Sequence, residues 1–397
     1  MAWEETYLAY SAALREVPRP TAFADLEALE ENIQKVLSYS GDRPIRIATK
    51  SIRCVPLLKD IQASHSRFIG FMTFSARESL YLSRQGLNDF LIGYPFMQKG
   101  EVEAYVELRQ QGKRAIAMVD SIEQAEAIHY GLRGTKVEGL VCLDVDMSSD
   151  WGWLYFGVRR SPLRWEEQVL ALAQSIRRLE NIRIVGVMAY EAQIAGLPDR
   201  GLGIKTPIVR FLKRRSWREV QRKRQAIVQA LRDAGFELEF VNGGGTGSLP
   251  LSAADPSVTE VTAGSAFFAP AFFDGYEAVR FRPAAGFSLE ITRRPAENIF
   301  TCQGGGYVAS GAPGPDKLPR PWLPPTARLL PHEGAGEVQT PVYIPNPPAF
   351  LRPGEPLYFR HAKAGELCQR FPLLYLVRKD KLTGFYSTYA ALPHAWV

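Results

Sequence analysis

The feature that most constrains the fold of this chain is an alternation of short β-rich runs with longer segments of helical pattern, between about residues 40 and 270. Eight runs combine β-branched, apolar and aromatic residues, and they cover residues 43–50, 67–75, 89–95, 114–121, 138–146, 183–191, 238–248 and 258–268. Repeated strand–helix units predict a parallel sheet, and eight of them in about 230 residues predict a closed (β/α)₈ barrel, the TIM barrel. A doubly wound open sheet is the alternative, but no GxGxxG turn follows the first run.

The pattern of the sequence changes after about residue 280. Pro and Gly become dense, as in PGPDKLPRPWLPPT, and alternating runs such as SLEITRRP, VQTPVYI and PLYFRHAK replace the helical pattern. Alternation of period two is typical of antiparallel strands with one buried face. We therefore predict an N-terminal segment (1–25) that packs on the β domain, an α/β barrel (26–280) and a C-terminal, mostly antiparallel β domain (281–397).

Composition narrows the class of protein. The 397 residues are 46% hydrophobic and 23% charged, which is an ordinary globular mixture. No apolar run approaches the roughly 20 residues of a membrane span, and the acidic N-terminus lacks the pattern of a signal peptide, so we expect no membrane partner. The four cysteines form no CxxC pair, which is typical of a cytoplasmic protein with free thiols.

One segment, RFLKRRSWREVQRKR (210–224), carries the strongest run of positive charge. A nucleic-acid-binding patch is one interpretation. The solvated face of an amphipathic helix, with Phe211, Trp217 and Val220 turned inward, is favoured because no aromatic stacking platform accompanies the charges. The formal net charge of +6 is compatible with an anionic ligand, and we expect no nucleic-acid partner.

Two neighbouring strand ends carry a glycine-rich pattern. The seventh run ends in GGGTGS and the eighth in AGS. Functional residues of such barrels lie at the carboxyl ends of the strands, and phosphate often binds between these two loops. Glycines let the backbone approach a ligand, and the N–H groups of such turns bind anions. The pattern predicts a phosphate site formed by Gly244, Gly245, Thr246, Gly247, Ser248, Gly264 and Ser265.

The first run, RPIRIATK, ends on Lys50 at the same edge of the predicted barrel. A lysine at a strand end is by default solvated. Beside a phosphate site, however, its amine can form a Schiff base with a phosphorylated carbonyl compound. Pyridoxal 5′-phosphate carries both an aldehyde and a phosphate, so we predict it as the cofactor.

Motifs along nearly the whole chain resemble the fold-type III pyridoxal-phosphate enzymes, above all the D-threonine aldolase and D-serine dehydratase group and the bacterial amino acid deaminase/aldolase proteins. The matching stretches are IATKSIRCVPLL, ESLYLSRQGLNDFLIGYP, LDVDMSSDWG, GVMAYEAQIAG, NGGGTGS, EVTAGS and FRHAKAGELC. The resemblance implies an alanine racemase N-terminal-like barrel, a homodimer, and Lys50 as the carrier of the cofactor in an internal aldimine. It also implies Tyr190 beside the pyridine ring, with Gln193 and Arg159 on the substrate side.

The motif HAKAGELC departs from the family pattern. The resemblance implies a divalent metal site of the form His-x-Cys or His-x-Asp, but the residue two positions after His361 is Lys363, whose protonated amine has no lone pair for a metal. One interpretation is a relocated zinc or manganese site that uses His361 with Cys368 or Glu366. A second is that Lys363 replaces the positive charge of the metal and acts with His361 in catalysis. A third is a structural turn.

These patterns together predict a pyridoxal-phosphate-dependent lyase whose substrate is a β-hydroxy D-amino acid. Cleavage would be of the retro-aldol type, or the hydroxyl group would leave in a dehydration. The alternative is a pyridoxal-phosphate-dependent amino acid racemase, which needs a second base, and Tyr307 is a candidate for it. A non-catalytic carrier of the cofactor is disfavoured, since such proteins usually consist of the barrel alone.

Overall fold

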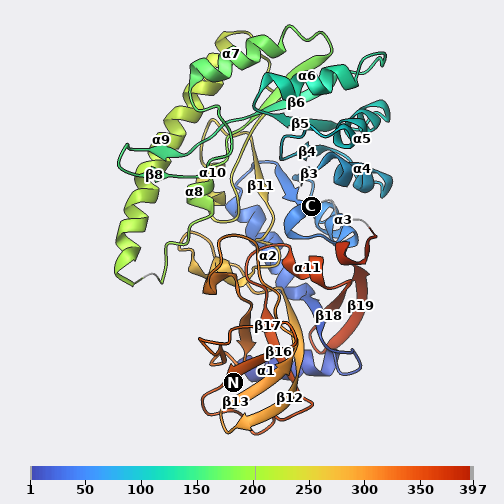
Figure 1. Cartoon of the computed structure of the whole chain (residues 1–397), viewed down its shortest axis with the longest axis vertical. Coiled ribbons are helices and arrows are strands. Elements are labelled where there is room, and N and C mark those ends of the chain that lie inside the picture. Colours follow the sequence, from blue (N-terminus) through green and yellow to red (C-terminus); the bar gives the residue numbers. More distant parts are fainter. Residues whose placement is uncertain (1, 202, 394–397) are drawn as a thin grey trace.

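The computed structural model of the chain describes residues 2–201 and 203–393. Eight parallel strands close into a barrel in the upper part of the molecule, and a nine-stranded sheet forms the lower part (Figure 1). In the order in which they pair, the barrel strands are β10 (Phe240–Gly243), β11 (Glu260–Ala263), β2 (Ile45–Ala48), β3 (Phe68–Thr73), β4 (Phe90–Ile92), β5 (Ala115–Val119), β6 (Gly139–Asp144) and β9 (Ile182–Met188). Each overlaps one of the predicted runs, which confirms the TIM barrel.

Helices connect the strands and cover the outside of the barrel (Figure 1). They are α2 (Leu26–Tyr39), α3 (Val55–Ala63), α4 (Ala76–Arg84), α5 (Lys99–Gln110), α6 (Ile122–Gly131), α7 (Glu166–Ile176), the short α8 (Ala192–Ala195), α9 (Thr206–Asp233) and the short α10 (Leu249–Ala253). Polar residues at strand ends also start helices: Ser75 Oγ accepts the N–H of Glu78 at 3.1 Å, and Asp25 Oδ1 accepts that of Ala28 at 3.0 Å. Such N-caps satisfy backbone donors that the helix leaves open.

The interior of the barrel is partly apolar and partly ionic. All residues of β2 and β5 are buried, as expected for parallel strands covered on both faces. An inner apolar cluster consists of Leu91, Ile116, Met118, Leu140, Cys142, Val185, Met188 and Phe240. Arg46 lies beside it, 1% exposed, and pairs with Glu260 and Asp89 at 2.7 Å each. These pairs neutralise a charge that burial would otherwise make very unfavourable.

The lower sheet forms the β domain. Its strand pairs are antiparallel, except that strand β1 (Thr21–Asp25) pairs with strand β18 (Leu373–Arg378) in parallel. In the order in which they pair, its strands are β15 (Arg328–Leu329), β16 (Gln339–Tyr343), β13 (Ile299–Gln303), β12 (Ala285–Ala296), β1, β18 and β19 (Lys381–Ser387). Strand β17 (Pro356–Arg360) also pairs with β12, and β14 (Arg320–Leu323) pairs with β17. Helix α1 (Ala2–Ala13) packs against β14, β18 and β19. The mostly antiparallel C-terminal domain of the sequence prediction is thus confirmed.

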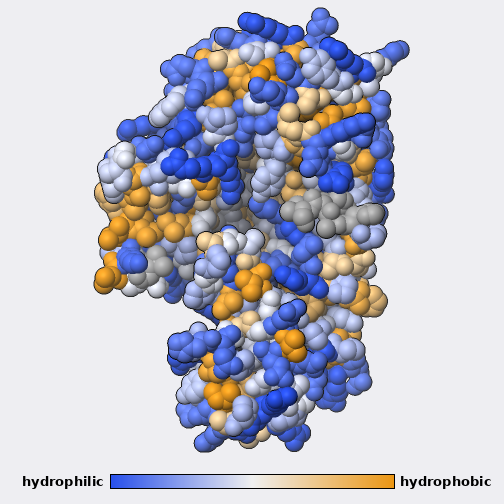
Figure 2. Space-filling model, viewed as in Figure 1, coloured by the Kyte–Doolittle hydropathy of each residue, from blue (hydrophilic) through white to orange (hydrophobic). Residues whose placement is uncertain are grey.

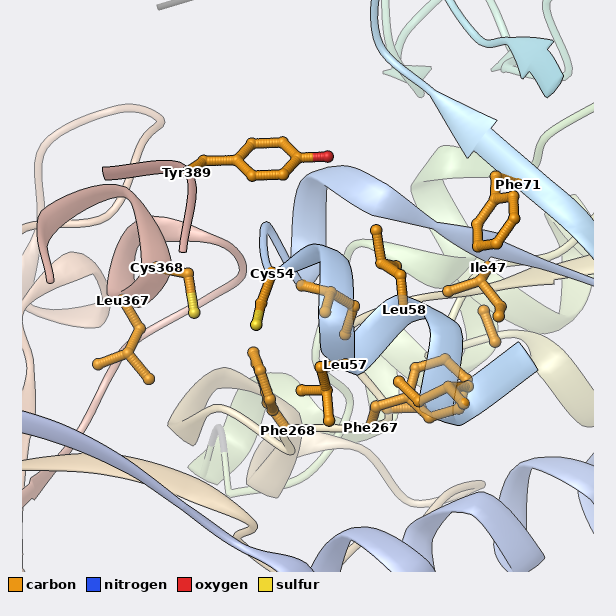
Figure 3. Packing of buried hydrophobic residues seen from close by; sticks show 14 of the residues in the cluster. Ile47, Cys54, Leu57, Leu58, Phe71, Phe267, Phe268, Leu367, Cys368 and Tyr389 are labelled. Carbon is orange, nitrogen blue, oxygen red and sulfur yellow. The ribbon is translucent and has the colours of Figure 1, made fainter. Parts of the chain in front are cut away.

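The two domains share one apolar core at their junction. Figure 3 shows Cys54 and Leu57 of the barrel and Leu367 and Cys368 of the β domain in one apolar cluster, with the two cysteine side chains next to each other. Helix α11 (Glu366–Arg370) carries the second pair. Because the core is continuous, the β domain is a fixed wall of the barrel mouth.

Helix α9 contains the basic segment predicted to be an amphipathic helix. Its buried stripe includes Lys213, Ser216, Val220 and Arg224, at spacings of three and four residues. Phe211 does not fall on this stripe and is 57% exposed, so the prediction that it turns inward was wrong. Within the described residues, no helix has both the length and the apolarity needed to cross a membrane.

Candidate active site

An open cavity of about 600 Å³ lies at the carboxyl ends of the barrel strands. Residues of the barrel line one side of it, and residues 308, 310, 363–366, 369 and 370 of the β domain line the other. The cavity therefore lies where the sequence placed the site, between the strand ends and the second domain. A cavity of this size suits a cofactor together with a small substrate.

Lys50 lies in a 3₁₀ turn, η1 (Thr49–Ser51), that follows β2 directly. Its Nζ donates a hydrogen bond to Tyr94 Oη at 2.8 Å and lies 5.4 Å from the centre of the Tyr94 ring. Burial raises the pKa of Tyr94, but the charges of Lys50 and Arg160 outweigh this and lower it. The reactive amine thus faces the cavity, hydrogen-bonded to a phenol that can exchange a proton with it.

The glycine turn (residues 244–248) follows β10 and forms the opposite side of the barrel mouth. Thr246 Oγ1 accepts the N–H of Ala266 at 3.1 Å, so the proton of its own hydroxyl is available to a ligand. Within the described residues, the N–H groups of Thr246, Gly264 and Ser265 have no hydrogen-bond partner. Three cavity-lining residues with open donors make a cradle for an anion.

The glycines of this region leave room for close approach. A Cβ at Gly245 would lie 3.0 Å from the Tyr190 ring, and one at Gly264 would lie 2.8 Å from Ser51 Oγ. Gly244 has a φ of +84°, which favours glycine. Gly247 faces away, because a Cβ there would lie 2.2 Å from the Tyr276 ring. The turn thus offers bare backbone to the cavity.

A fully buried ion-pair cluster holds the glycine turn in place. Arg224 donates to Glu191 Oε2 at 2.6 Å and to Asp255 Oδ2 at 2.8 Å. Glu191 Oε1 accepts from Ser248 Oγ at 2.5 Å and from Ser252 Oγ at 2.6 Å. Ser248, predicted to bind phosphate, is therefore already engaged in positioning the turn and does not line the cavity.

Three of the cavity residues that were not predicted carry groups that can act on a ligand. Asp144, at the end of β6, has a pKa raised to about 7 by burial and by the charges of Asp120 and Asp146. Arg160 lines the cavity nearby and forms no hydrogen bond or ion pair with the described residues. Tyr94 is the third. The strand-end rule points to Asp144 and Tyr94, but it gives no sign of their partners.

Other predicted residues lie outside the cavity lining. Gln193 Nε2 donates to Met147 O at 2.7 Å and to Ser216 Oγ at 3.0 Å, inside the core. Arg159 stacks on the Tyr155 ring at 4.1 Å, while its neighbour Arg160 reaches the cavity. Tyr190 does line the cavity, and burial together with the nearby Glu191 raises its pKa.

The late loop (residues 361–368) separates the residues that the sequence grouped as a metal site. His361 is 1% exposed, neither ring nitrogen forms a hydrogen bond of normal geometry, and burial lowers its pKa to about 4. It does not line the cavity, and neither does Cys368, whereas Lys363 and Glu366 do. In residues 2–201 and 203–393 there is no group of three His, Cys, Asp or Glu side chains that could hold a metal ion.

The barrel side of the cavity fits pyridoxal phosphate. The amine of Lys50 suits its aldehyde, and the open donors of Thr246, Gly264 and Ser265 suit its phosphate. Tyr190 lines the same cavity and packs closely on the glycine turn, where a Cβ at Gly245 would lie 3.0 Å from its ring.

Comparisons with known proteins agree with this fit. The chain is similar to the 3-hydroxy-D-aspartate aldolase of Paracoccus denitrificans (strain Pd 1222), with 23% identity over 258 residues, 64% of this chain and 61% of that protein. It is similar to the D-threonine aldolase of Arthrobacter sp, with 24% identity over 266 residues, 66% of this chain and 63% of that protein. The match thus spans about three fifths of the length of these relatives.

Solved structures share the fold over nearly the whole chain. The D-threonine aldolase from Filomicrobium marinum has a TM-score of 0.82 at 18% identity and covers 95% of this chain and 96% of its own. The D-threo-3-hydroxyaspartate dehydratase from Delftia sp. HT23 has a TM-score of 0.77 at 18% identity and covers 97% and 100%. The family profile described as alanine racemase, N-terminal domain matches residues 24–270, more than half of the chain. The chain therefore belongs to the alanine racemase N-terminal domain family, a family of pyridoxal-phosphate proteins.

Proposed function

We propose that the chain is a pyridoxal-phosphate-dependent lyase that acts on β-hydroxy D-amino acids, by retro-aldol cleavage or by dehydration. The observation that carries the proposal is the amine of Lys50 in the same cavity as an anion cradle. The names of the similar proteins support it, because 3-hydroxy-D-aspartate aldolase, D-threonine aldolase and D-threo-3-hydroxyaspartate dehydratase all refer to such substrates.

The residues of the barrel divide the work between holding and proton transfer. Lys50 would hold the cofactor through its amine, and Thr246 and Ser265 would hold the phosphate through hydroxyl and N–H donors. When bound, the cofactor supplies an electron sink next to the α carbon of the substrate. Lys50 Nζ and Tyr94 Oη, 2.8 Å apart, would hold a proton and pass it between them in this cavity.

Arg160 and Asp144 lie where they can orient the substrate. The guanidinium of Arg160 forms no hydrogen bond or ion pair with the described residues, although its charge acts on the nearby Asp144, so we assign it to the carboxylate of the amino acid. Asp144, with its pKa raised to about 7, can hold a proton at neutral pH and donate a hydrogen bond as a neutral acid.

The racemase alternative receives no support from Tyr307. The Tyr307 ring packs 5.0 Å from that of Phe287 and 4.8 Å from that of Phe371, and it does not line the cavity. Within one subunit, racemisation would therefore need another second base.

The test uses purified protein with D-threonine, D-serine and 3-hydroxy-D-aspartate, with each L-enantiomer as a control. We expect an aldehyde or a keto acid from at least one D-substrate. Lys50→Ala should abolish both turnover and the visible absorption band of the bound cofactor, whereas Lys59→Ala, an exposed lysine of α3, should change neither. Interconversion of enantiomers without either product would favour the racemase, and a Lys50→Ala variant that keeps its band would overturn the proposal.

We further propose that the protein is a cytoplasmic homodimer. Figure 2 shows an apolar patch on the left flank, over the start of α9, where Ile204, Ile208 and Phe211 are 91%, 60% and 57% exposed. Exposed apolar patches commonly mark protein interfaces, and the four free, buried thiols suit a reducing compartment. Light scattering of the wild type and of an Ile208→Asp variant would test the dimer, which the variant should weaken.

A further inference from the structure

The late loop lies directly on the backbone of the reactive lysine. A Cβ at Gly365 would be 2.0 Å from the carbonyl oxygen of Lys50, so only glycine permits this approach. Arg53, three residues after Lys50, donates from Nη1 to Gln369 Oε1, and its carbonyl accepts the N–H of Tyr389 at 2.8 Å. These contacts fix the late loop at the mouth of the site, where it faces the amine of Lys50.

The side chains of this loop do not fit a divalent metal. Glu366 turns back on its own loop, where Oε1 accepts the N–H of Lys363 at 2.6 Å and Oε2 that of Ala364 at 2.8 Å. The sulfur of Cys368 lies in the core beside Cys54 (Figure 3), and Cys368 does not line the cavity. His361 does not line the cavity either, and the described part of the chain holds no group of three His, Cys, Asp or Glu side chains for a metal ion.

Lys363 is the cation that this loop presents to the cavity instead. Its Nζ lies 5.8 Å from the centre of the Phe272 ring, and a Cβ at Gly311 would lie 3.9 Å from it. It forms no hydrogen bond or ion pair with the described residues. The nearby Lys317, by contrast, is paired with Asp316. An ammonium held in a cavity wall without a counter-ion is available to negative charge on a ligand.

We propose that the Lys363 ammonium replaces the divalent metal that the family pattern implies, and stabilises negative charge on the β-oxygen of the substrate. This inference rests on the proposed lyase function and adds that the reaction needs no metal. The role is electrostatic: the ammonium donates a hydrogen bond to the β-oxygen and keeps its own proton. Such a preorganised donor acts where charge develops, as a metal ion would.

The experiment compares Lys363→Met, which keeps the length of the side chain without its charge, with Lys363→Arg, which keeps the charge. On the holoenzyme we expect kcat of Lys363→Met to fall by about 100- to 1000-fold and that of Lys363→Arg to fall less. Lys317→Met, which removes an already paired ammonium, should stay within about fivefold of the wild type. Metal analysis of the active wild type should find no stoichiometric metal, and chelator should leave turnover unchanged.

A spectroscopic measurement separates this role from a structural one. D-Alanine has no β-oxygen, so the Kd from its perturbation of the visible band should be the same for Lys363→Met and the wild type. A raised Kd would show that the variant damages the site itself and would overturn the assignment.

Three further outcomes would also overturn it. The first is wild-type turnover that chelator abolishes and manganese or zinc restores, and the second is a Lys363→Met variant with full turnover. The third is a raised KM for 3-hydroxy-D-aspartate with unchanged kcat on D-threonine, which would make Lys363 a binder of a second carboxylate. A wild type with no turnover on any β-hydroxy D-amino acid would instead overturn the proposed function, and this inference with it.

Discussion

The two walls of the cavity differ in how completely their polar groups are satisfied. Behind the barrel wall, the buried Glu191 accepts hydrogen bonds from both Arg224 and Ser248, and this cluster holds a turn whose open donors point to an anion. On the β-domain wall, Lys363 stands without a partner among the described residues, and the carboxylate of Glu366 serves its own loop. The barrel wall therefore suits a fixed cofactor, whereas the β-domain wall presents two cations without a partner among the described residues, Lys363 and Arg370, to whatever enters.

This contrast teaches which part of such a site is free to change. Removing a member of the buried cluster leaves another charge unpaired, so the barrel wall tolerates little variation. A cation on the second wall is replaceable by another cation without disturbing the core. The departure from the family pattern lies on the second wall, where a substitution costs the least folding stability.

The largest expected effect comes from breaking the barrel wall. Arg224→Ala leaves Glu191 and Asp255 buried without their counter-charge, and we expect a loss of about 3–5 kcal/mol in the free energy of unfolding. Urea unfolding measures it. Arg222→Ala, on the exposed face of the same helix, is the matched control and should have no comparable effect. Equal stability of the two variants would contradict the role of the buried cluster.

A second prediction concerns the contact between the two walls. Glu78 is fully buried, accepts a hydrogen bond from Tyr389 at 2.8 Å, and has a pKa raised to about 7 by burial. An unfolded glutamate titrates near pH 4.3. Between these values the folded chain holds a proton that the unfolded chain has released, so stability from this group is lost as the pH rises, by about 4 kcal/mol in all.

Glu78→Gln removes that dependence. The difference in unfolding free energy between the wild type and the variant should therefore shift in favour of the variant from pH 5 to pH 8. Glu103→Gln, at an exposed glutamate of α5, should show no such shift. A constant difference across this range would show that Glu78 does not titrate in the folded protein.

The third prediction displaces the β-domain wall alone. Gly365→Ala places a Cβ against the Lys50 carbonyl, so the late loop must move away from the site. Because displacements of about 1 Å cost up to about 100-fold in rate, we expect kcat to fall by about 10- to 100-fold with the cofactor still bound. Gly100→Ala, in open space on α5, should keep full activity. Unchanged turnover in Gly365→Ala would show that the position of the late loop does not affect catalysis.

The smallest expected effect concerns the phosphate site on the barrel wall. Thr246→Val removes a hydroxyl whose proton is open to the phosphate, and the cofactor Kd should rise about tenfold, since hydrogen bonds to charged groups contribute about 1.5 kcal/mol or more. Thr246→Ser retains the hydroxyl and should bind nearly as the wild type does. Absorbance titration of the apoprotein measures both, and equal Kd values for the Val and Ser variants would remove Thr246 from the phosphate site.

The eight strands, the glycine turn and Lys50 could be predicted because each is a local pattern at a strand end. The residues that the sequence placed less well depend on distant partners. Gln193 is held inside by Ser216, and Arg159 is taken up by Tyr155, so a motif could not reveal which arginine reaches the cavity. Lys363 has no carboxylate partner among the described residues because Glu366 accepts backbone N–H groups of its own loop. No spacing in HAKAGELC indicates this.

The contact of Gly365 with the Lys50 carbonyl has a consequence for protein engineering. The two segments are more than 300 positions apart in the sequence, yet their backbones pack so closely that no Cβ fits between them. A chimera that combines this barrel with the second domain of a metal-dependent relative must keep a glycine at the position of Gly365. Otherwise the imported metal ligands would stand too far from the amine to share a substrate with it.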